Sequence, residues 1–431
     1  MTSVIAPIAT LLLSTALLLM GNGLQGVLLP VRGGLENFTS LDLGILGGSY
    51  FLGFAVGCVK GPQLVRRVGH IRVFTAMVAI VSATALAHPL LLSPAVWWAL
   101  RAVTGFCFAA IYMVIESWLN ERSTVETRGT VFSIYTIINL TVITVGQMML
   151  ALGTPVDLKL FSIVSILVSV AAVPVALSRA AAPAPIQRVR IRPLRMYRIS
   201  PVGFVGCLTV GFVNGAFWSL GPVFAQKYGT SITGVALFMS LTVMLGAVGQ
   251  WPLGRASDSI DRRKVIVGAC IGGVLAALGL IIVEDLGLPA IFASAAIYGF
   301  FVLPLYALSV AHTNDFVQPE DYVETSSTLL LLYAAGAIVG PVAASAAMAY
   351  MGAPGLFAFN AVCLAALAVF AVWRMARRHP SPGEPHTDFA DSIRFAQTVG
   401  PVELLAEESG TAGDGDAAPE QDDLPPINAE R

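Results

Sequence analysis

The sequence predicts an all-α membrane protein with twelve transmembrane helices arranged as two six-helix halves. Three observations support this fold class. Of the 431 residues, 56% are hydrophobic and 12% are charged, whereas a soluble domain carries about 25% charged residues. Twelve apolar segments reach, or nearly reach, the roughly 20 residues that a helix needs to cross a bilayer. The two halves of the chain also repeat the same residues at a fixed offset.

The twelve apolar segments are expected to be helices. In lipid every backbone polar group must be hydrogen-bonded within the protein, and a membrane barrel would show alternating strands instead. The segments lie near 5–30, 43–60, 71–92, 95–117, 129–151, 158–177, 201–225, 233–253, 265–283, 288–311, 326–350 and 355–375. The first has no Lys or Arg before Arg32 and is longer than the apolar region of a signal peptide, so we expect it to stay as a membrane helix.

Basic residues gather on one side of these helices. The connections 60–72, 116–129, 178–200, 254–264 and 311–325, together with the end of the last helix, contain 19 Lys and Arg residues. The connections on the other side contain three, namely Arg32, Lys159 and Lys227. Because basic loops stay in the cytoplasm, we expect a multi-pass protein of a bacterial inner membrane with both termini cytoplasmic.

The longest connection divides the chain into domains. We predict a six-helix bundle over residues 1–177, a basic cytoplasmic linker over 178–200, a second six-helix bundle over 201–379 and a disordered acidic tail over 380–431. The linker has six arginines and no acid, which is typical of a hinge that follows the positive-inside rule or of a contact with anionic lipid. The tail is rich in Pro, Gly, Asp and Glu, a composition that does not support a packed core.

The two halves match at an offset of 192 residues without a gap. The pairs are Asn22-Gly23 with Asn214-Gly215, Leu28 with Leu220, Pro30 with Pro222, and Gly57 with Gly249. Parallel six-helix repeats are typical of transporters that bind their solute between the halves, near the middle of the membrane.

Several motifs resemble those of the major facilitator superfamily. The run from Gly254 to Lys264, with Asp258 inside it, resembles the glycine–aspartate–basic loop of that family, and its first-half copy over 64–72 has Arg66 where the acid is expected. The helix 4 motif is Arg101-x-x-x-Gly105-x-x-x-Ala109, and the glycine–proline motif is Gly336-x-x-x-Gly340-Pro341.

Four further segments resemble the YcaD-like branch of this superfamily, and the resemblance covers roughly residues 5–375. They are Gly48-Ser-Tyr50-Phe51-x-Gly53, Val114-Ile-Glu116-Ser117, Gly249-Gln250-Trp251-Pro252-x-Gly254-Arg255 and Leu303-Pro304-Leu-Tyr306-Ala307. The resemblance implies the major facilitator fold, with a cavity lined by helices 1, 4, 7 and 10. It implies transport but no particular substrate.

Two ionisable residues lie well inside the predicted membrane, both on the fourth helix. A charged side chain there costs roughly 2.5–3.5 kcal/mol on insertion scales, which makes Arg101 and Glu116 candidates for function. Arg101 either recognises an anionic solute or donates to backbone carbonyls. Glu116 either carries a coupled proton or pairs with cytoplasmic arginines. With Tyr112 they share one face of the helix at about 100° per residue.

Neutral polar and aromatic side chains complete the predicted substrate site. They lie on the helices expected to line the cavity, and a single Asn or Gln could instead hydrogen-bond a neighbouring helix. The predicted substrate-binding residues are Asn22, Gln25, Arg101, Tyr112, Asn214, Trp218, Tyr298 and Tyr306.

The loops between helices 2 and 3 and between helices 8 and 9 supply candidate gating residues. These are Arg67, Gly69, Asp258, Arg262 and Arg263. If Asp258 reaches the start of helix 11 at Thr325 and Ser326 in only one state of the carrier, it biases the equilibrium between states. The alternative is a plain basic loop with one incidental acid.

These features predict a secondary active transporter that moves a small polar or amphiphilic organic solute by alternating access. An anionic or zwitterionic solute is favoured, and proton coupling and uniport both stay open. The alternative is a non-transporting membrane receptor or scaffold on the same fold. No enzyme is expected, because no His-Glu-x-x-His, Gly-x-Ser-x-Gly or phosphate-loop motif is present.

We expect no cofactor, no metal and no nucleic-acid partner. The five cysteines lie in apolar runs, which is typical of small buried side chains: they are Cys58, Cys107, Cys207, Cys270 and Cys363. The lipid bilayer and the solute are the expected partners of a monomer.

Overall fold

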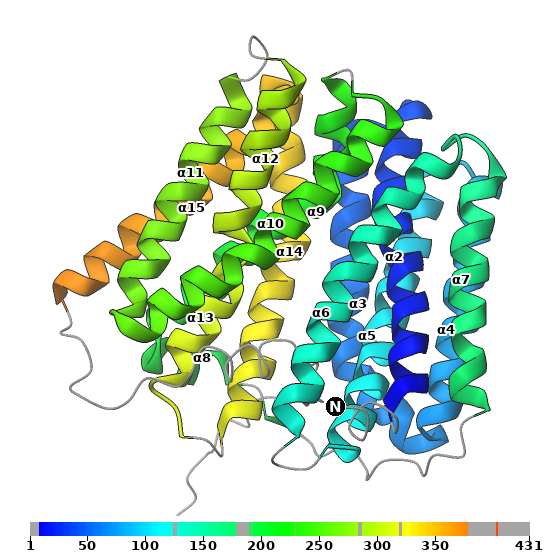
Figure 1. The fold of residues 1–431 in the computed structure, drawn as a ribbon, viewed down its shortest axis with the longest axis horizontal. Helices are drawn as coiled ribbons and strands as arrows, with labels where there is room; N and C mark the ends of the chain where they lie inside the picture. The colour runs from blue at the N-terminus through cyan, green and yellow to red at the C-terminus, as the bar shows by residue number, and fades with distance from the viewer. Residues whose placement is uncertain are drawn as a thin grey trace, which may run out of the picture.

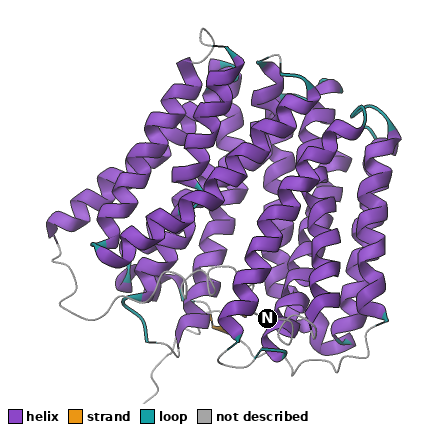
Figure 2. Cartoon of the chain, in the orientation of Figure 1, coloured by secondary structure: helices purple, strands orange, loops and turns teal. Residues whose placement is uncertain are grey.

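The computed structural model describes residues 8–123, 127–177, 189–190, 192–228, 230–282, 287–318, 321–377 and 402–403. Within them, twelve helices are long and apolar enough to cross a membrane. Figures 1 and 2 show these helices standing side by side in two groups. The predicted fold class, an all-α membrane protein of twelve spans, is therefore confirmed. Apart from 402–403, the predicted acidic tail lies outside the described residues, as do residues 178–188 and 191 of the predicted linker.

The first half contains six spans, which follow one another with short connections. They are α2 (Ala9–Leu35), α3 (Ser40–Val68), α4 (His70–Leu90), α5 (Pro94–Glu121), α6 (Arg128–Met148) with the 3-10 turn η2 (Met149–Leu152), and α7 (Leu158–Ala176). The helix α3 begins with a capping box, in which the Thr39 hydroxyl accepts from the Asp42 backbone and the Asp42 carboxylate accepts from the Thr39 backbone. Such a box satisfies two backbone donors that a helix start otherwise leaves unpaired.

The second half repeats this plan. Its helices are α9 (Pro201–Lys227), α10 (Ile232–Ser259), α11 (Arg262–Ile282), α12 (Leu288–Val302), α13 (Leu305–Asn314), α14 (Tyr322–Met351) and α15 (Gly355–Arg377). The helices α12 and α13 together form one span, which was predicted as a continuous helix. The break falls at Leu303 and Pro304, because proline cannot donate the backbone hydrogen bond that a continuous helix requires.

The linker contains a short helix that the sequence did not predict. The helix α8 (Pro193–Ile199) precedes α9, and Arg195 pairs with Asp321 at 2.8 Å and with Glu324 at 3.4 Å beside the start of α14. These carboxylates raise the pKa of Arg195, chiefly through the hydrogen bond to Asp321. Two two-residue strands, β1 (Val189–Arg190) and β2 (Val402–Glu403), pair in parallel.

The bundle has two ends, which we name for the features they carry. The linker end carries α8 and the first described residues of α2, as Figure 1 shows. The opposite end is where α2 finishes and α3 begins. Several contacts between the halves lie near the opposite end: Gly44 and Gly48 of α3 approach the backbone carbonyls of Pro341 and Ile338 on α14.

A second contact between the halves lies on the other flank of the bundle. The Ser240 hydroxyl of α10 donates to the Thr144 carbonyl of α6 at 3.4 Å. Ser240 lies near the start of α10 and Thr144 near the finish of α6, so this contact also belongs to the opposite end. The two halves thus close around the centre of the molecule from two flanks at that end.

Candidate functional site

A cavity of about 200 Å³ lies between the two halves. Helices of both halves form its wall: α2, α3, α5 and α6 from the first, and α9, α10 and α14 from the second. The lining residues are Asn22, Gly23, Gly26, Val27, Leu29, Pro30, Leu43, Leu46, Gly47, Tyr50, Phe51, Arg101, Ile143, Gln147, Trp218, Ser219, Met239 and Tyr333. A pocket at a helix interface with few polar groups is the usual form of a small-molecule site.

Arg101 is the charged residue among those that line the cavity. Its guanidinium carbon lies 4.4 Å from the centre of the Tyr50 ring, a cation–π arrangement. Its Nη1 atom is buried and has no hydrogen-bond partner among the described residues. A ring face supplies some stabilisation but no hydrogen-bond acceptor, so the guanidinium keeps the capacity to bind a carboxylate or phosphate.

Neutral polar groups surround this cation. The side chain of Asn22 lies beside the Tyr50 hydroxyl, and that of Asn214 lies beside the Tyr333 hydroxyl. Gln147 of α6 is only 2% exposed, and its Oε1 atom has no partner within the described part of the chain. The cavity therefore combines one cation with a buried acceptor and tyrosine hydroxyls from both halves.

Aromatic rings form the apolar part of the wall and connect the halves. The Phe51 ring of α3 meets the Tyr333 ring of α14 edge-on at 6.4 Å. Trp218 of α9 lines the same cavity and packs against Phe217. Aromatic surfaces of this kind suit the apolar body of an organic solute.

The structure brings together three of the predicted substrate-binding residues directly, since Asn22, Arg101 and Trp218 line the cavity. Asn214 lies behind the wall and reaches it through Tyr333. The repeat-related pair Asn22 and Asn214 thus each support a tyrosine of the wall, one in each half. Their roles in binding stay predictions.

Other predicted residues lie outside the lining of this cavity. Tyr306 touches Tyr333 edge-on at 5.0 Å, and Tyr112 packs against Phe54 and Phe108. Gln25 is buried on α2.

Tyr298 has a different environment, inside the second half. Its hydroxyl accepts a hydrogen bond from Asn360 at 2.8 Å, and its ring packs against Phe217 and Phe357. The sequence places Tyr298 on a helix expected to line the cavity, but the rotation of α12 turns this side chain into the bundle.

Glu116 is buried in α5 near the linker end and does not line the cavity. Fifteen residues at 1.5 Å each separate it from Arg101 by about 22 Å along the helix. Arg101 and Glu116 therefore lie in separate parts of the molecule, as their spacing in the sequence predicts.

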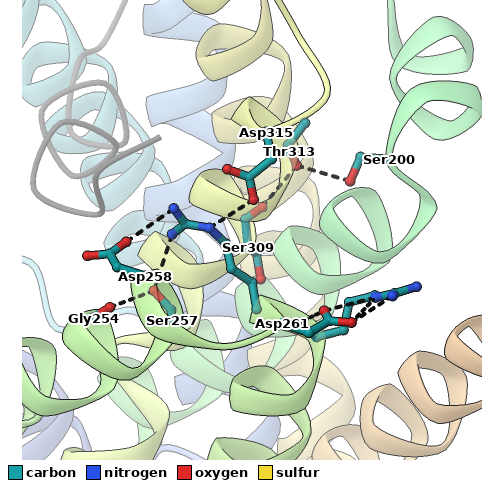
Figure 3. A network of polar contacts seen from close by, with 10 residues as sticks. Ser200, Gly254, Ser257, Asp258, Asp261, Ser309, Thr313 and Asp315 are labelled. Atoms are coloured by element: carbon teal, nitrogen blue, oxygen red, sulfur yellow. Dashed lines mark hydrogen bonds and ion pairs between the residues drawn. The ribbon is translucent and has the colours of Figure 1, made fainter. Parts of the chain in front are cut away.

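The predicted gating residues of the second half form a partly buried ionic cluster, shown in Figure 3. The Arg262 side chain is 1% exposed and lies 2.8 Å from Asp315 and 3.2 Å from Asp258. It also donates to the Ser257 hydroxyl. These contacts join α10, α11 and the end of α13, three helices of the same half, and they do not test the proposed contact of Asp258 with α14.

A second pair stands beside this cluster. Arg263 donates to both carboxylate oxygens of Asp261, the closer contact being 2.7 Å. Burial acts to raise the pKa of Asp261, but the hydrogen bonds from Arg263 outweigh it and hold that pKa below its ordinary value.

The first half has no matching buried pair at the corresponding loop in the described residues. Arg67 is exposed, and Gly69 has φ +89°, a conformation that favours glycine, between α3 and α4. Arg66 occupies the position of the acid in this loop, so the first half cannot form the ion pair that Asp258 makes with Arg262 in the second half.

Sequence reasoning missed several residues of the wall, notably Tyr50, Phe51, Gln147 and Ser219. Tyr50 and Phe51 belong to a segment that carries the family resemblance, which was an available signal. Gln147 is an amide within a long apolar run, and burial of an amide in a membrane helix is costly without a partner.

Comparisons with known proteins agree with this architecture. Residues 11–288 match the family model described as Major Facilitator Superfamily. The chain is 28% identical over 382 residues to an uncharacterized MFS-type transporter of Enterobacter sp. (strain 638), covering 87% of this chain and 97% of that protein. It is 26% identical over 337 residues to the uncharacterized MFS-type transporter YcaD of Escherichia fergusonii, covering 78% and 87%.

Two solved structures share the fold. A bacterial homolog of the human lysosomal transporter Spinster, in an inward-facing and occupied conformation, superposes with a TM-score of 0.70 at 16% identity, covering 87% of this chain and 98% of that one. The nucleoside transporter NupG superposes with a TM-score of 0.70 at 12% identity, covering 86% and 99%.

Proposed function

The chain belongs to the Major Facilitator Superfamily, in its YcaD-like branch, and from this we propose that it is a secondary transporter that moves a small organic solute through the cavity around Arg101 by alternating access. Membership makes it a multi-pass membrane transporter. The alternative of a receptor or scaffold is not favoured by these relationships.

The observation that carries the proposed site is the unpaired charge in the wall between the halves. Arg101 has an aromatic ring as its neighbour and no described carboxylate at ion-pair distance. A cation in the membrane is costly, and an anionic group on the solute would offset that cost. We therefore propose that the solute carries an anionic group, as an anion or a zwitterion.

Alternating access requires the halves to separate at one end while they close at the other. Contacts near the opposite end, at Gly44, Gly48 and Ser240, join helices of different halves and are the ones that must break. In this proposal the linker end, where the basic connections lie, faces the cytoplasm. In this proposal, breaking those contacts opens the cavity to the far side of the membrane.

Glu116 is proposed as the proton-coupling group. It is a buried carboxylate near the linker end, within the same helix as Arg101. Protonation there and anion binding at Arg101 would act on one rigid element, α5. Uniport remains the alternative, and a transport assay with an imposed pH gradient separates the two.

The test is a thermal-shift screen of the purified protein against a library of small organic anions, zwitterions, neutral solutes and cations. A ligand at 100 times its Kd stabilises the folded state by about 2.7 kcal/mol. We expect hits among compounds with a carboxylate or phosphate, and weaker binding of the same hits by Arg101→Lys and Arg101→Ala.

Lysine keeps the charge but loses the planar fork, so we expect an affinity loss of roughly 10- to 100-fold, the range that charge-assisted hydrogen bonds support. Lys159→Ala, which removes an exposed cation near the opposite end, is the matched control. If hits are neutral or cationic, or if both Arg101 variants keep parental affinity, the proposed role of Arg101 is wrong.

A further inference from the structure

A second pocket, of about 510 Å³, lies between α3 and α5 towards the linker end and is separate from the central cavity. It is lined by Lys60, Gln63, Leu64, Arg66, Arg67 and Phe106. Three of these six residues are cations and none is an acid. None of the three cations is in an ion pair with a described carboxylate.

This pocket faces away from the central cavity. Lys60 follows Phe51, which lines the central cavity, by nine residues, and nine residues at about 100° each place the two on opposite sides of α3. On the side of Lys60, the apolar residues Leu52 and Val56 are 50% and 46% exposed. Apolar side chains so exposed on a membrane-spanning helix are expected to face lipid.

The depth of the pocket matches the boundary between acyl chains and headgroups. Lys60 lies eighteen residues after Asp42, about 27 Å along the helix, and the hydrocarbon core is about 30 Å thick. Arg67 lies about 10 Å further towards the linker end. The cations therefore stand at headgroup level, and the exposed stripe of Leu52 and Val56 continues from them into the core.

We propose that this pocket binds an anionic phospholipid, with its headgroup phosphate between Lys60, Arg66 and Arg67 and an acyl chain along Leu52 and Val56. Strand β2, with Glu403, also contacts α3, but none of the three cations is ion-paired with a described carboxylate. Their combined charge favours a headgroup with net negative charge over a zwitterionic one, whose ammonium would face like charges. The apolar stripe favours a lipid over a soluble phosphate. This proposal concerns α3 of the first half and does not depend on the solute that is transported.

The experiment is a titration of the full-length purified protein in detergent, followed by native mass spectrometry. The probes are phosphatidylglycerol and phosphatidylcholine with identical acyl chains, and glycerol phosphate as a soluble competitor. The variants are Arg67→Ala and the double variant Lys60→Ala with Arg67→Ala. Arg72→Ala is the matched control, because Arg72 is an exposed cation just beyond Gly69 that does not line the pocket.

We expect the first phosphatidylglycerol to bind more tightly than phosphatidylcholine. Its affinity should fall about five-fold for each cation removed, so about 25-fold in the double variant. Arg72→Ala should retain parental affinity, and the thermal midpoints of all variants should match, because the replaced side chains are exposed.

Three results would overturn the proposal. Equal affinity for the two lipids would show that charge does not select the occupant. An equal loss in Arg72→Ala would show diffuse attraction to the basic surface. Full displacement by glycerol phosphate at equal concentration would show that the acyl chain contributes nothing and that the site binds a soluble phosphate.

Discussion

Within the ionic cluster at the linker end of the second half, substitution of Arg262 is expected to lower the free energy of unfolding most. Its side chain is 1% exposed and bridges two carboxylates that differ in burial, with Asp315 at 10% exposure and Asp258 at 31%. Arg262→Gln keeps much of the side-chain length but removes the charge. The change removes the positive charge that lies 2.8 Å from the largely buried carboxylate of Asp315.

The structure ranks three substitutions in this cluster by the free energy of unfolding that each should cost. Removing one partner of a buried ion pair costs about 3–5 kcal/mol, which we expect for Arg262→Gln. Asp315→Asn leaves Arg262 with Asp258 and should cost about 1.5–3 kcal/mol, the value of a hydrogen bond to a charged group. Asp258→Asn breaks a more solvated pair and should cost about 0–1 kcal/mol.

The measurement is the free energy of unfolding from detergent titration in mixed micelles, with Arg255→Gln as the control because Arg255 is exposed on the neighbouring helix α10. The double variant Arg262→Gln with Asp315→Asn should be no less stable than Arg262→Gln alone, because the second change removes the carboxylate charge that Arg262 faced. If Asp258→Asn costs as much as Arg262→Gln, or if all three single variants lie within 1 kcal/mol, the cluster is solvated and the reasoning fails.

Three further predictions concern the proposed gate at Asp258, the packing of α3 against α5 at Gly53, and the pH dependence of stability at Asp261. Asp258→Asn should shift the balance of inward- and outward-facing states more than it changes ligand affinity, and identical accessibility labelling of variant and parent would contradict this. Gly53→Ala should cost about 1–3 kcal/mol, because its Cβ would collide with the Ala102 carbonyl. By contrast, Gly268→Ala meets open space and should be neutral or stabilising in the same thermal melts. The pKa of Asp261 is lowered in the folded state, so ionised Asp261 contributes to stability above its ordinary pKa of 3.8, and this contribution is lost as the pH falls through the lower folded pKa. The thermal midpoints of Asp261→Asn and of the parent should therefore converge at acidic pH. A difference between them that grows at acidic pH would contradict the assignment.

The sequence alone determined the number, approximate limits and type of the membrane helices. This follows from the physics of the bilayer, which demands about 20 apolar residues per span and leaves the helix as the local solution for backbone hydrogen bonds. The repeat at 192 residues and the family motifs then indicated two halves around a central site. Of the residues predicted from the expected order of the helices, Asn22, Arg101 and Trp218 line the cavity, whereas Tyr298 does not.

Only the tertiary structure decided which faces of the helices meet. Helix rotation separates Tyr298, which is hydrogen-bonded by Asn360 inside the second half, from Tyr333, which lines the cavity. The pairing of Arg262 with Asp315 joins residues far apart in the chain, and a local pattern does not predict it. Membrane helices are apolar on nearly all sides, so the sequence pattern around each axis carries little information about which face packs inward, and the packing of small residues such as Gly53 settles it.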